Sequence, residues 1–273
     1  MGDPVAGNPT QYMLEKAFAV GRLDWRFLTF EVPAIDFEGA LRGARIFGFH
    51  GIMLAPPHRA TVLPYLEELT DVARLCGQVN CIKQFRGRLC GDNTEGRALR
   101  QLVEQAADLA DAQVTILGAG RLAKALAAEL AQAKVREIVF ACRRPETIAE
   151  FVETLTAQTQ LVSCRTELLP VQSTLIIHPD CRLLVNATPI GRLQSREQAP
   201  VDVSSLPTGA IVADVVYNPP QTWLLRTARE LGYSTIDGLT LLIEQVALAF
   251  ETWTGATADR QAMREAVEEF LVL

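Results

Sequence analysis

Short apolar runs alternate with amphipathic segments along most of the chain. The apolar runs are rich in Val, Ile and Leu, which is typical of strands that are buried on both faces of a parallel sheet. The segments between them carry apolar residues at helical spacing. We therefore expect an α/β protein in which strands and helices alternate.

The predicted strands cover residues 25–32, 49–54, 79–85, 88–91, 137–142, 183–187, 211–217 and 234–236, and one more begins at residue 114. The predicted helices cover residues 35–47, 59–69, 95–109, 121–133, 145–155, 222–231, 239–254 and 259–271. Arg86-Gly87 stands between two predicted strands and predicts a hairpin turn. A chain of 273 residues has room for two domains, and we expect the helix at 95–109 to join them.

The composition excludes several classes of protein. Hydrophobic residues make up 49% of the chain and charged residues 21%, which excludes a disordered chain. The net charge of −6, from 26 basic and 32 acidic residues, argues against a dedicated nucleic-acid binder. No apolar run approaches the ~18–20 residues that cross a bilayer, and the first residues do not resemble a signal peptide. We expect a cytoplasmic monomer or homodimer that binds neither nucleic acid nor membrane.

The cysteines and histidines are not spaced like metal ligands. The six cysteines form no C-x-x-C pair, and the three histidines stand far apart. Most of the cysteines lie in apolar runs, where a free thiol behaves as a small hydrophobic group. We expect reduced cysteines and no metal site.

A glycine-containing turn follows the strand that begins at residue 114. In this position Gly118 permits a tight turn, Gly120 lets the backbone approach a diphosphate, and Ala123 lets the following helix pack closely on the strand. The alternative is a tight turn that binds nothing. The predicted cofactor contacts of this turn are Gly118, Ala119, Gly120, Arg121, Leu122 and Ala123.

The end of the next strand distinguishes NAD from NADP. NAD sites usually carry an Asp or Glu there, which accepts a hydrogen bond from the ribose 2′-hydroxyl. This chain has Cys142, Arg143 and Arg144 instead, and two guanidinium groups suit a 2′-phosphate. Arginines at a strand end can also be no more than solvated charge. Because the carboxylate is missing, the sequence favours NADP, with NAD as the alternative.

Two later strands also end in polar turn residues. Asn186, Ala187 and Thr188 end one of them, and Asp214 and Tyr217 follow the next. Ligands of open parallel sheets bind at the carboxyl ends of the strands, so these residues are expected around the same crevice. The same residue types also occur in ordinary loops.

Four motifs of the second half occur in order: Gly118 to Gly120, Asn186 to Gly191, Asp214 to Thr222, and Asp237 to Gln245 and on to Gly255. In these motifs the chain resembles the shikimate dehydrogenase family. The resemblance implies an α/β substrate-binding domain at residues 1–96, rejoined by helices at 239–273, and a doubly wound Rossmann NADP domain at residues 97–238. It also implies cofactor contacts from Val215, Tyr217 and Gly238. The implied reaction interconverts shikimate and 3-dehydroshikimate with NADP(H), a step of aromatic amino acid biosynthesis.

The resemblance is weaker in the first half. Asn8 and Thr10 replace two serines that hold the substrate carboxylate in the family, and Met53 and Ala55 replace an Asn and a Thr. Other positions, such as Asn80, are retained. The substrate contacts that the resemblance implies are Asn8, Thr10, Met53, Ala55, Asn80, Thr94, Tyr217 and Gln245.

Arg59 and Glu95 stand where the family has its catalytic Lys and Asp. In the family that pair moves a proton at the reacting hydroxyl group. An arginine can orient and polarise a carbonyl, but it is a poor proton donor, and Glu95 is one methylene longer than Asp. We predict that Arg59 and Glu95 are the catalytic residues of a modified site.

Three functions are compatible with these residues. The first is an NADP-dependent dehydrogenase of this family with weak or altered activity on shikimate. The second is a dehydrogenase of the quinate or aminoshikimate type. Both would act on a small cyclic hydroxy acid. The third is a non-catalytic nucleotide- or metabolite-binding paralogue, which the missing Lys supports and the retained Asn80 and Gln245 oppose.

Overall fold

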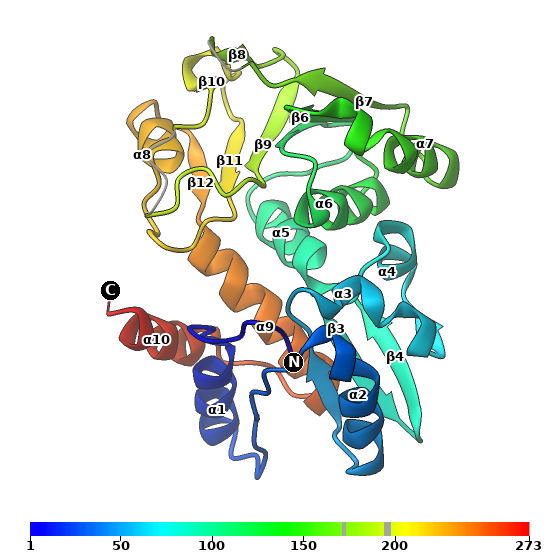
Figure 1. Ribbon diagram of the computed structural model, residues 1–273. Helices are drawn as coiled ribbons and strands as arrows, with labels where there is room; N and C mark the ends of the chain where they lie inside the picture. The colour runs from blue at the N-terminus through cyan, green and yellow to red at the C-terminus, as the bar shows by residue number, and fades with distance from the viewer. Residues whose placement is uncertain (171–172, 194–197, 273) are drawn as a thin grey trace. The chain divides into compact units, whose positions relative to one another are not determined.

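The computed structural model describes residues 1–170, 173–193 and 198–272 of the chain. The chain divides into two compact units, which Figure 1 shows. Unit 1 comprises Met1–Thr94 and Ile243–Leu273, and unit 2 comprises Glu95–Leu242. Within the described ranges no helix is long and apolar enough to cross a membrane. The described His, Cys, Asp and Glu side chains form no group that could hold a metal ion.

Unit 1 contains a small mixed sheet with the strand order β1-β3-β4-β2. Its strands are β1 (Gly51–Met53), β2 (Glu68–Leu69), β3 (Cys81–Phe85) and β4 (Arg88–Asp92). The first three in this order pair antiparallel, whereas β2 pairs parallel to β4. Arg86 and Gly87 both have positive φ, 50° and 77°, as a two-residue type I′ turn requires. The predicted hairpin is therefore confirmed.

The helices of unit 1 come from both ends of the chain. They are α1 (Thr10–Val20), η1 (Ala34–Asp36), α2 (Phe37–Ile46), α3 (His58–Thr61), η2 (Leu63–Tyr65), α4 (Asp71–Cys76), α10 (Arg260–Leu271) and the later part of α9 (Gly238–Thr254). The predictions of α2, α9 and α10 are confirmed. Two helices, α1 and α4, lie outside the predicted ones, although α1 buries Met13, Leu14, Ala17 and Phe18 at helical spacing.

The predicted helix at 59–69 is wrong beyond its first turn. Pro64 has no N–H to donate, and a proline disfavours helical backbone in the residue before it. The α-helix therefore stops at Thr61, and a short 3-10 turn follows. The Glu67 N–H then donates to the Leu89 carbonyl, so the chain continues as a strand beside β4.

The predicted strand at 25–32 is also wrong. Its backbone makes only one isolated bridge, between Gly2 and Glu31. Its aromatic side chains contact both helices and loop residues: Trp25 contacts Phe18 and His50, and Phe27 contacts Trp253. The Phe27 N–H donates to the Glu15 carboxylate, outside any sheet ladder.

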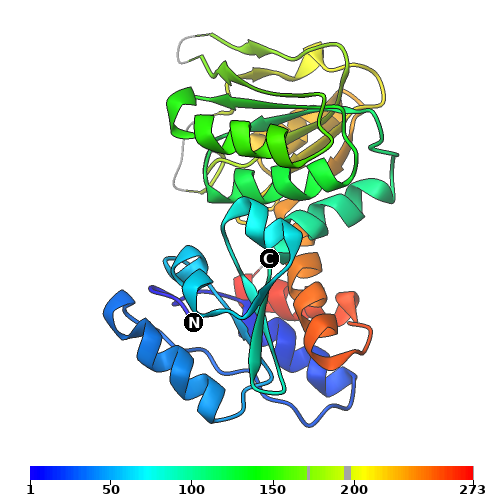
Figure 2. The ribbon, with the colours of Figure 1, turned by 90° about the vertical axis from the view of Figure 1, so that its right-hand side faces the viewer.

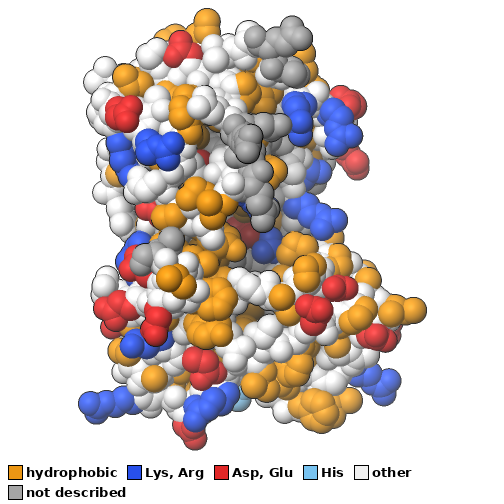
Figure 3. Space-filling view, turned by 60° about the vertical axis from the view of Figure 1, so that its left-hand side comes forward, with side chains coloured by type: hydrophobic (Ala, Val, Ile, Leu, Met, Phe, Trp, Pro, Cys, Tyr) orange, Lys and Arg blue, Asp and Glu red, His pale blue; other side chains and the backbone are white. Residues whose placement is uncertain are grey.

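The core of unit 1 joins distant parts of the sequence. The Trp253 indole N–H donates to the Ile82 carbonyl at 2.9 Å. It lies against Gly51, where an added Cβ would come within 2.1 Å of the indole nitrogen, so only glycine fits there. Phe250 stacks on Phe18 at 5.4 Å. Figure 3 shows that some hydrophobic side chains reach the surface of the molecule.

Unit 2 is built on six parallel strands in the order β12-β11-β9-β5-β6-β7. They are β5 (Gln113–Leu117), β6 (Glu137–Cys142), β7 (Ser163–Leu168), β9 (Cys181–Asn186), β11 (Ile211–Asp214) and β12 (Ser234–Ile236). This is the doubly wound Rossmann order, in which the direction of winding reverses between β5 and β9. The predicted fold class is confirmed. The edge strand β7 was not predicted because only partly buried and exposed residues form it.

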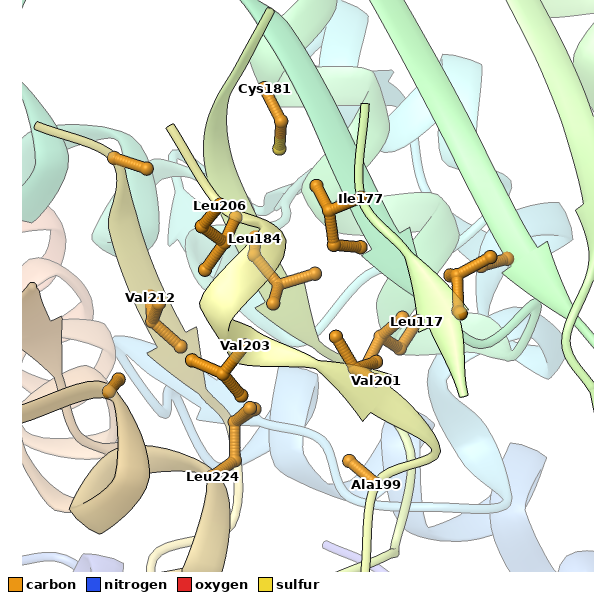
Figure 4. Close-up of a cluster of buried hydrophobic side chains, with 14 of the residues drawn as sticks. Leu117, Ile177, Cys181, Leu184, Ala199, Val201, Val203, Leu206, Val212 and Leu224 are labelled. Atoms are coloured by element: carbon orange, nitrogen blue, oxygen red, sulfur yellow. The ribbon is translucent and has the colours of Figure 1, made fainter. Parts of the chain in front are cut away.

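Helices cover both faces of this sheet. They are α5 (Thr94–Glu104), α6 (Arg121–Gln132), η3 (Pro145–Thr147), α7 (Ala149–Gln158), η4 (Val203–Ser205), α8 (Trp223–Glu230) and the first residues of α9. Figures 1 and 2 show α6 and α7 on one face and α8 on the other. A short pair, β8 (Leu175–Ile176) and β10 (Val201–Asp202), packs on the α8 face. There Leu184 and Val212 of the sheet meet Val203 and Leu224 (Figure 4).

Candidate functional site

The turn between β5 and α6 carries two glycines, and the backbone requires only the first of them. Gly118 has a φ of 107°, and a Cβ there would lie 3.0 Å from Thr188 Cγ2 and 3.3 Å from the Ala187 carbonyl oxygen. A Cβ on Gly120 would meet no protein atom within 4 Å. Gly120 is also the N-cap residue of α6 and has no side chain to cap its first N–H groups. In dinucleotide sites a bound phosphate takes that role.

A pocket of about 540 Å³ opens at this turn, at the carboxyl ends of the central strands. It is lined by Gly118, Ala119, Gly120, Cys142, Arg143, Arg144, Thr147, Leu169, Ala187, Thr188, Pro189, Ile190 and Arg192. The predicted residues Arg121, Leu122, Ala123, Asn186, Val215, Tyr217 and Gly238 do not line it. Sequence reasoning missed Thr147, Leu169, Pro189, Ile190 and Arg192, of which the last carries a visible signal, its positive charge.

The wall of the pocket at β6 is formed by the three residues predicted to select the cofactor. Arg143 and Arg144 are exposed, and Thr147 Oγ1 donates to the Arg144 carbonyl at 2.7 Å and fixes this turn. Burial raises the pKa of the Cys142 thiol, so this side chain stays neutral. No carboxylate is among the described residues that line the pocket. Its walls are therefore cationic, as a phosphate-rich ligand requires.

The wall at β9 is held rigid by one buried amide. Asn186 Oδ1 accepts from the Thr188 N–H at 3.1 Å and from the Thr188 hydroxyl at 2.6 Å. Asn186 Nδ2 donates to the Ile190 carbonyl at 3.0 Å and to Asp214 Oδ1 at 2.9 Å. Although Asn186 lies outside the pocket, it sets the shape of the loop that lines it.

Asp214 is a fully buried carboxylate beneath this loop. Besides the Asn186 amide, it accepts from the Val216 N–H at 3.0 Å and from the Thr222 hydroxyl at 2.8 Å. Burial raises the pKa of Asp214 from 3.8 to about 6, and these hydrogen bonds oppose the shift only in part. The residue thus links the ends of β9 and β11 to the start of α8.

The remaining predicted cofactor residues lie after β11 and at the start of α9. Gly238 packs against the backbone of Val216 and Tyr217, and an added Cβ would lie 2.4 Å from the Val216 carbonyl oxygen. Val215 and Tyr217 are half-buried on this segment. Gly238 therefore allows α9 to begin directly against the loop after β11.

Two predicted substrate contacts of unit 1 hold each other in place. The Asn80 side chain donates to Thr94 Oγ1 at 3.0 Å and accepts from the Thr94 N–H at 2.8 Å. Both residues are completely buried. This pair joins the start of β3 to the first residue of α5.

The predicted substrate contacts Asn8, Thr10, Met53 and Ala55 lie on two segments of unit 1. Asn8 is exposed, and its Oδ1 accepts from the Thr10 N–H at 3.0 Å at the start of α1. Thr10 is buried. Met53, at the end of β1, is 9% exposed, and Ala55 is half-buried. The side chains at these two positions are therefore a buried thioether and a half-buried methyl group.

Arg59 and the residue before it have different roles in α3. Arg59 is half-buried, and its Nε donates to the Leu54 carbonyl at 3.1 Å, which orients the guanidinium. His58 is fully buried, stacks on Phe37 at 4.3 Å and contacts the Val32 carbonyl through Nε2 at 2.7 Å. These contacts explain His58 as part of the core.

The last two predicted site residues lie on helices that are firmly fixed in their own units. Glu95, 7% exposed, is in the first turn of α5. Its neighbour Gly96 packs on α6, where an added Cβ would lie 2.5 Å from the Ala125 carbonyl oxygen. Gln245 is half-buried on α9, next to Glu244, which receives two hydrogen bonds of 2.6 and 2.7 Å from Arg260 of α10.

Comparisons with known proteins agree over the whole length of the chain. The shikimate dehydrogenase substrate binding domain matches residues 1–82, shikimate / quinate 5-dehydrogenase matches residues 101–175, and the shikimate 5′-dehydrogenase C-terminal domain matches residues 238–268. Shikimate dehydrogenase (NADP(+)) of Methanopyrus kandleri is 36% identical over 278 residues, which cover 99% of this chain and 94% of that protein.

Two solved structures are similar over nearly their full length. The ligand-free 5-ketofructose reductase of Gluconobacter sp. strain CHM43 has a TM-score of 0.94 at 32% identity, covering 98% of this chain and 96% of that one. A shikimate dehydrogenase in complex with NADP+ has a TM-score of 0.87 at 30% identity, covering 98% and 93%.

Proposed function

Since this chain belongs to the shikimate dehydrogenase family, we propose that it is an NADP-dependent oxidoreductase that interconverts a CH–OH group and a ketone on a small polyhydroxylated molecule. The observation that carries this proposal is the pocket at the β5–β9 switch point. It combines a glycine turn, an uncapped helix N-terminus and arginines without a carboxylate among its described lining residues. The bound nicotinamide would accept or supply the hydride.

Binding of NADP rather than NAD would follow from the β6 end of this pocket. The Gly118–Gly120 turn would hold the diphosphate, and Arg143 and Arg144 would bind the 2′-phosphate with charge-assisted hydrogen bonds. An NAD site would instead need a carboxylate at this strand end. Affinity for NADPH well above that for NADH is therefore expected.

For the chemical step we propose Arg59 as a fixed cation that orients and polarises the reacting carbonyl. The hydrogen bond from its Nε–H to the Leu54 carbonyl restricts the plane of the guanidinium group. Glu95, nearly buried in the first turn of α5, is proposed to take up the proton when the hydroxyl group is oxidised. Asn80 and Thr94, which hold each other, are proposed to contact the ring hydroxyl groups of the substrate.

The substrate itself is expected to differ from shikimate. Met53 and Ala55 offer no hydrogen bond from their side chains, and each polar substrate group left unpaired would cost about 1–3 kcal/mol. Asn8 Oδ1 already accepts a hydrogen bond from the Thr10 backbone, and an amide oxygen repels a carboxylate. These residues favour a substrate with fewer or differently placed polar groups.

One alternative substrate class is a ketose without a carboxylate. Two observations favour it. Asn8 and Thr10 stand where the family has its carboxylate-binding serines, and the chain is similar to a 5-ketofructose reductase. A neutral sugar ketone would not need the missing serines. The reduced substrate would then be a ketose or polyol rather than a cyclic acid.

The test is a comparison of substrates with the purified full chain, followed as NADPH absorbance. Shikimate and quinate would be offered with NADP+ and with NAD+, and 3-dehydroshikimate and 5-ketofructose with NADPH. Turnover of shikimate, quinate or 3-dehydroshikimate supports a cyclic hydroxy acid as the substrate. Turnover of 5-ketofructose alone supports a ketose. NADPH binding without turnover of any substrate would favour a non-catalytic metabolite-binding protein.

Two variants test the assigned residues on whichever substrate is turned over. Glu95→Gln removes the proton acceptor and is expected to lower kcat by about 10²–10⁴ while NADPH affinity stays unchanged. Arg59→Lys with Glu95→Asp restores the pair of the family and is expected to raise shikimate oxidation. If Glu95→Gln keeps full activity, Glu95 does not move the proton.

A further inference from the structure

The dinucleotide pocket carries a third arginine on the wall opposite to Arg143 and Arg144. Arg192 lines the pocket from the loop after β9, whereas the other two line it from the end of β6. Strands β6 and β9 flank β5 on opposite sides. The turn that follows β5 therefore has a cationic side chain on each side.

Among the described residues, no side-chain contact gives Arg192 a role in the fold. Its side chain is exposed, and only its backbone N–H is engaged, to the Pro189 carbonyl at 3.3 Å. Within the described ranges its guanidinium has no salt bridge, whereas Arg136 and Arg165 of the same unit pair with Asp180 and Glu137.

The loop that carries Arg192 has a fixed shape. The Ile190 N–H donates to Thr188 Oγ1 at 3.2 Å, and the Ile190 carbonyl accepts from the buried Asn186 amide at 3.0 Å. Gly191, with a φ of 100°, then turns the chain into Arg192. A long side chain on a rigid loop loses less entropy on binding than one on a mobile loop.

This loop lies directly on the turn expected to hold the diphosphate. Thr188 Cγ2 and the Ala187 carbonyl are the atoms that a Cβ on Gly118 would meet, at 3.0 and 3.3 Å. Arg192 is four residues further along the same loop, on the far side of this turn from Arg143. The 2′-phosphate is expected at the end of β6, so the phosphate nearest to the Arg192 wall is the diphosphate.

We propose that Arg192 is a binding residue for the diphosphate of the cofactor, closing the pocket from the β9 side. The inference rests on the proposed dinucleotide function and deepens it by dividing the three arginines. Arg143 and Arg144 read the 2′-phosphate and so discriminate NADPH from NADH. Arg192 binds a group that both dinucleotides share, so it contributes to affinity without contributing to that discrimination.

The test measures dissociation constants of the full chain for NADPH, NADH, ADP-ribose and adenosine 2′-monophosphate by fluorescence or calorimetry. Arg192→Ala is expected to weaken NADPH, NADH and ADP-ribose by the same factor, about tenfold or more, as the loss of one charge-assisted hydrogen bond does. Adenosine 2′-monophosphate, which has no diphosphate, should bind as before. Arg143→Ala should show the opposite pattern, with weaker NADPH and adenosine 2′-monophosphate and unchanged NADH.

Arg182→Ala is the matched control, because Arg182 is exposed on β9 but does not line the pocket. It should leave all four dissociation constants unchanged. If Arg192→Ala weakens NADPH but not NADH, Arg192 binds the 2′-phosphate and the assignment is overturned. If it changes none of the constants, Arg192 is a solvated surface charge. If the wild-type chain binds neither NADPH nor NADH, the proposed function itself fails, and Arg192 with it.

Discussion

Asp214 allows a sharp test of how burial governs the stability of unit 2. The substitution Asp214→Asn keeps the shape of the side chain and removes its charge. The carbonyl oxygen of the new amide can still accept from Asn186 and Val216, and its NH₂ group can donate to the Thr222 hydroxyl, which needs only to rotate. The substitution therefore removes the desolvated charge. The hydroxyl hydrogen of Thr222 loses its acceptor, but this cost does not change with pH.

The sign of the pH dependence follows from the raised pKa. Asp214 titrates at about 6 when folded and near 3.8 when its solvation is ordinary. Its contribution to stability is fully present below pH 3.8 and is lost as the pH rises through 6. At about 1.4 kcal/mol per pKa unit, the loss in the wild type amounts to about 1 kcal/mol at pH 4.5 and about 3 kcal/mol at pH 7.5. Asp214→Asn does not suffer this loss.

The assay is urea unfolding of wild type and Asp214→Asn, followed by circular dichroism between pH 4.5 and 7.5. The difference in unfolding free energy is expected to grow by about 2 kcal/mol in favour of the variant over this range. Asp111→Asn is the control, because Asp111 is exposed in the same unit and its side chain makes no hydrogen bond or ion pair among the described residues; its pH profile should be parallel to that of the wild type. Parallel profiles for Asp214→Asn would refute the argument and show that the folded carboxyl group titrates normally.

Three substitutions test the packing around the site by the same unfolding assay. Gly96→Ala should destabilise the chain by about 1–3 kcal/mol, because its Cβ would lie 2.5 Å from the Ala125 carbonyl oxygen; Gly39→Ala, in open space on α2, should be neutral or stabilising. Gly118→Ala should cost at least about 1–2 kcal/mol and weaken NADPH binding, because its φ is 107°. Glu244→Gln should lower the free energy of unfolding by about 1–3 kcal/mol, because it weakens the hydrogen bonds from Arg260. An unchanged urea midpoint would show that this ion pair does not stabilise the fold.

The parallel sheet of unit 2 could be predicted because its strands are continuous apolar runs. The end of each such run also marks the edge where ligands bind, so Gly118, Arg143 and Thr188 could be placed at one pocket from the sequence alone. The edge strand β7 has no apolar run, and it was missed. Arg192 was missed for a different reason: a single arginine in a loop looks like solvated charge until the loop is seen against the turn at Gly118.

Unit 1 was predicted less well because its elements depend on contacts between distant residues. Trp25 and Phe27 alternate as in a strand, but their ring contacts are with distant residues, Trp25 with Phe18 and His50 and Phe27 with Trp253. The helix expected at 59–69 ends at Thr61, ahead of Pro64, and a sequence pattern alone gives little weight to a single residue. Local periodicity does not contain this information.

The same contrast bears on how the function of this chain could diverge. The cofactor pocket is set largely by backbone geometry at strand ends, since Gly118, with a φ of 107°, admits few substitutes. The substrate residues Met53 and Ala55 are instead single side chains on the rim of a small sheet, which can change without altering a turn or a helix cap. Asn80 and Thr94 are the exception, because each satisfies the other's buried polar groups and losing either leaves its partner unpaired. Retention of this pair can therefore be explained by the fold alone, so the substrate assays above, rather than Asn80 and Thr94, must decide which substrate the chain accepts.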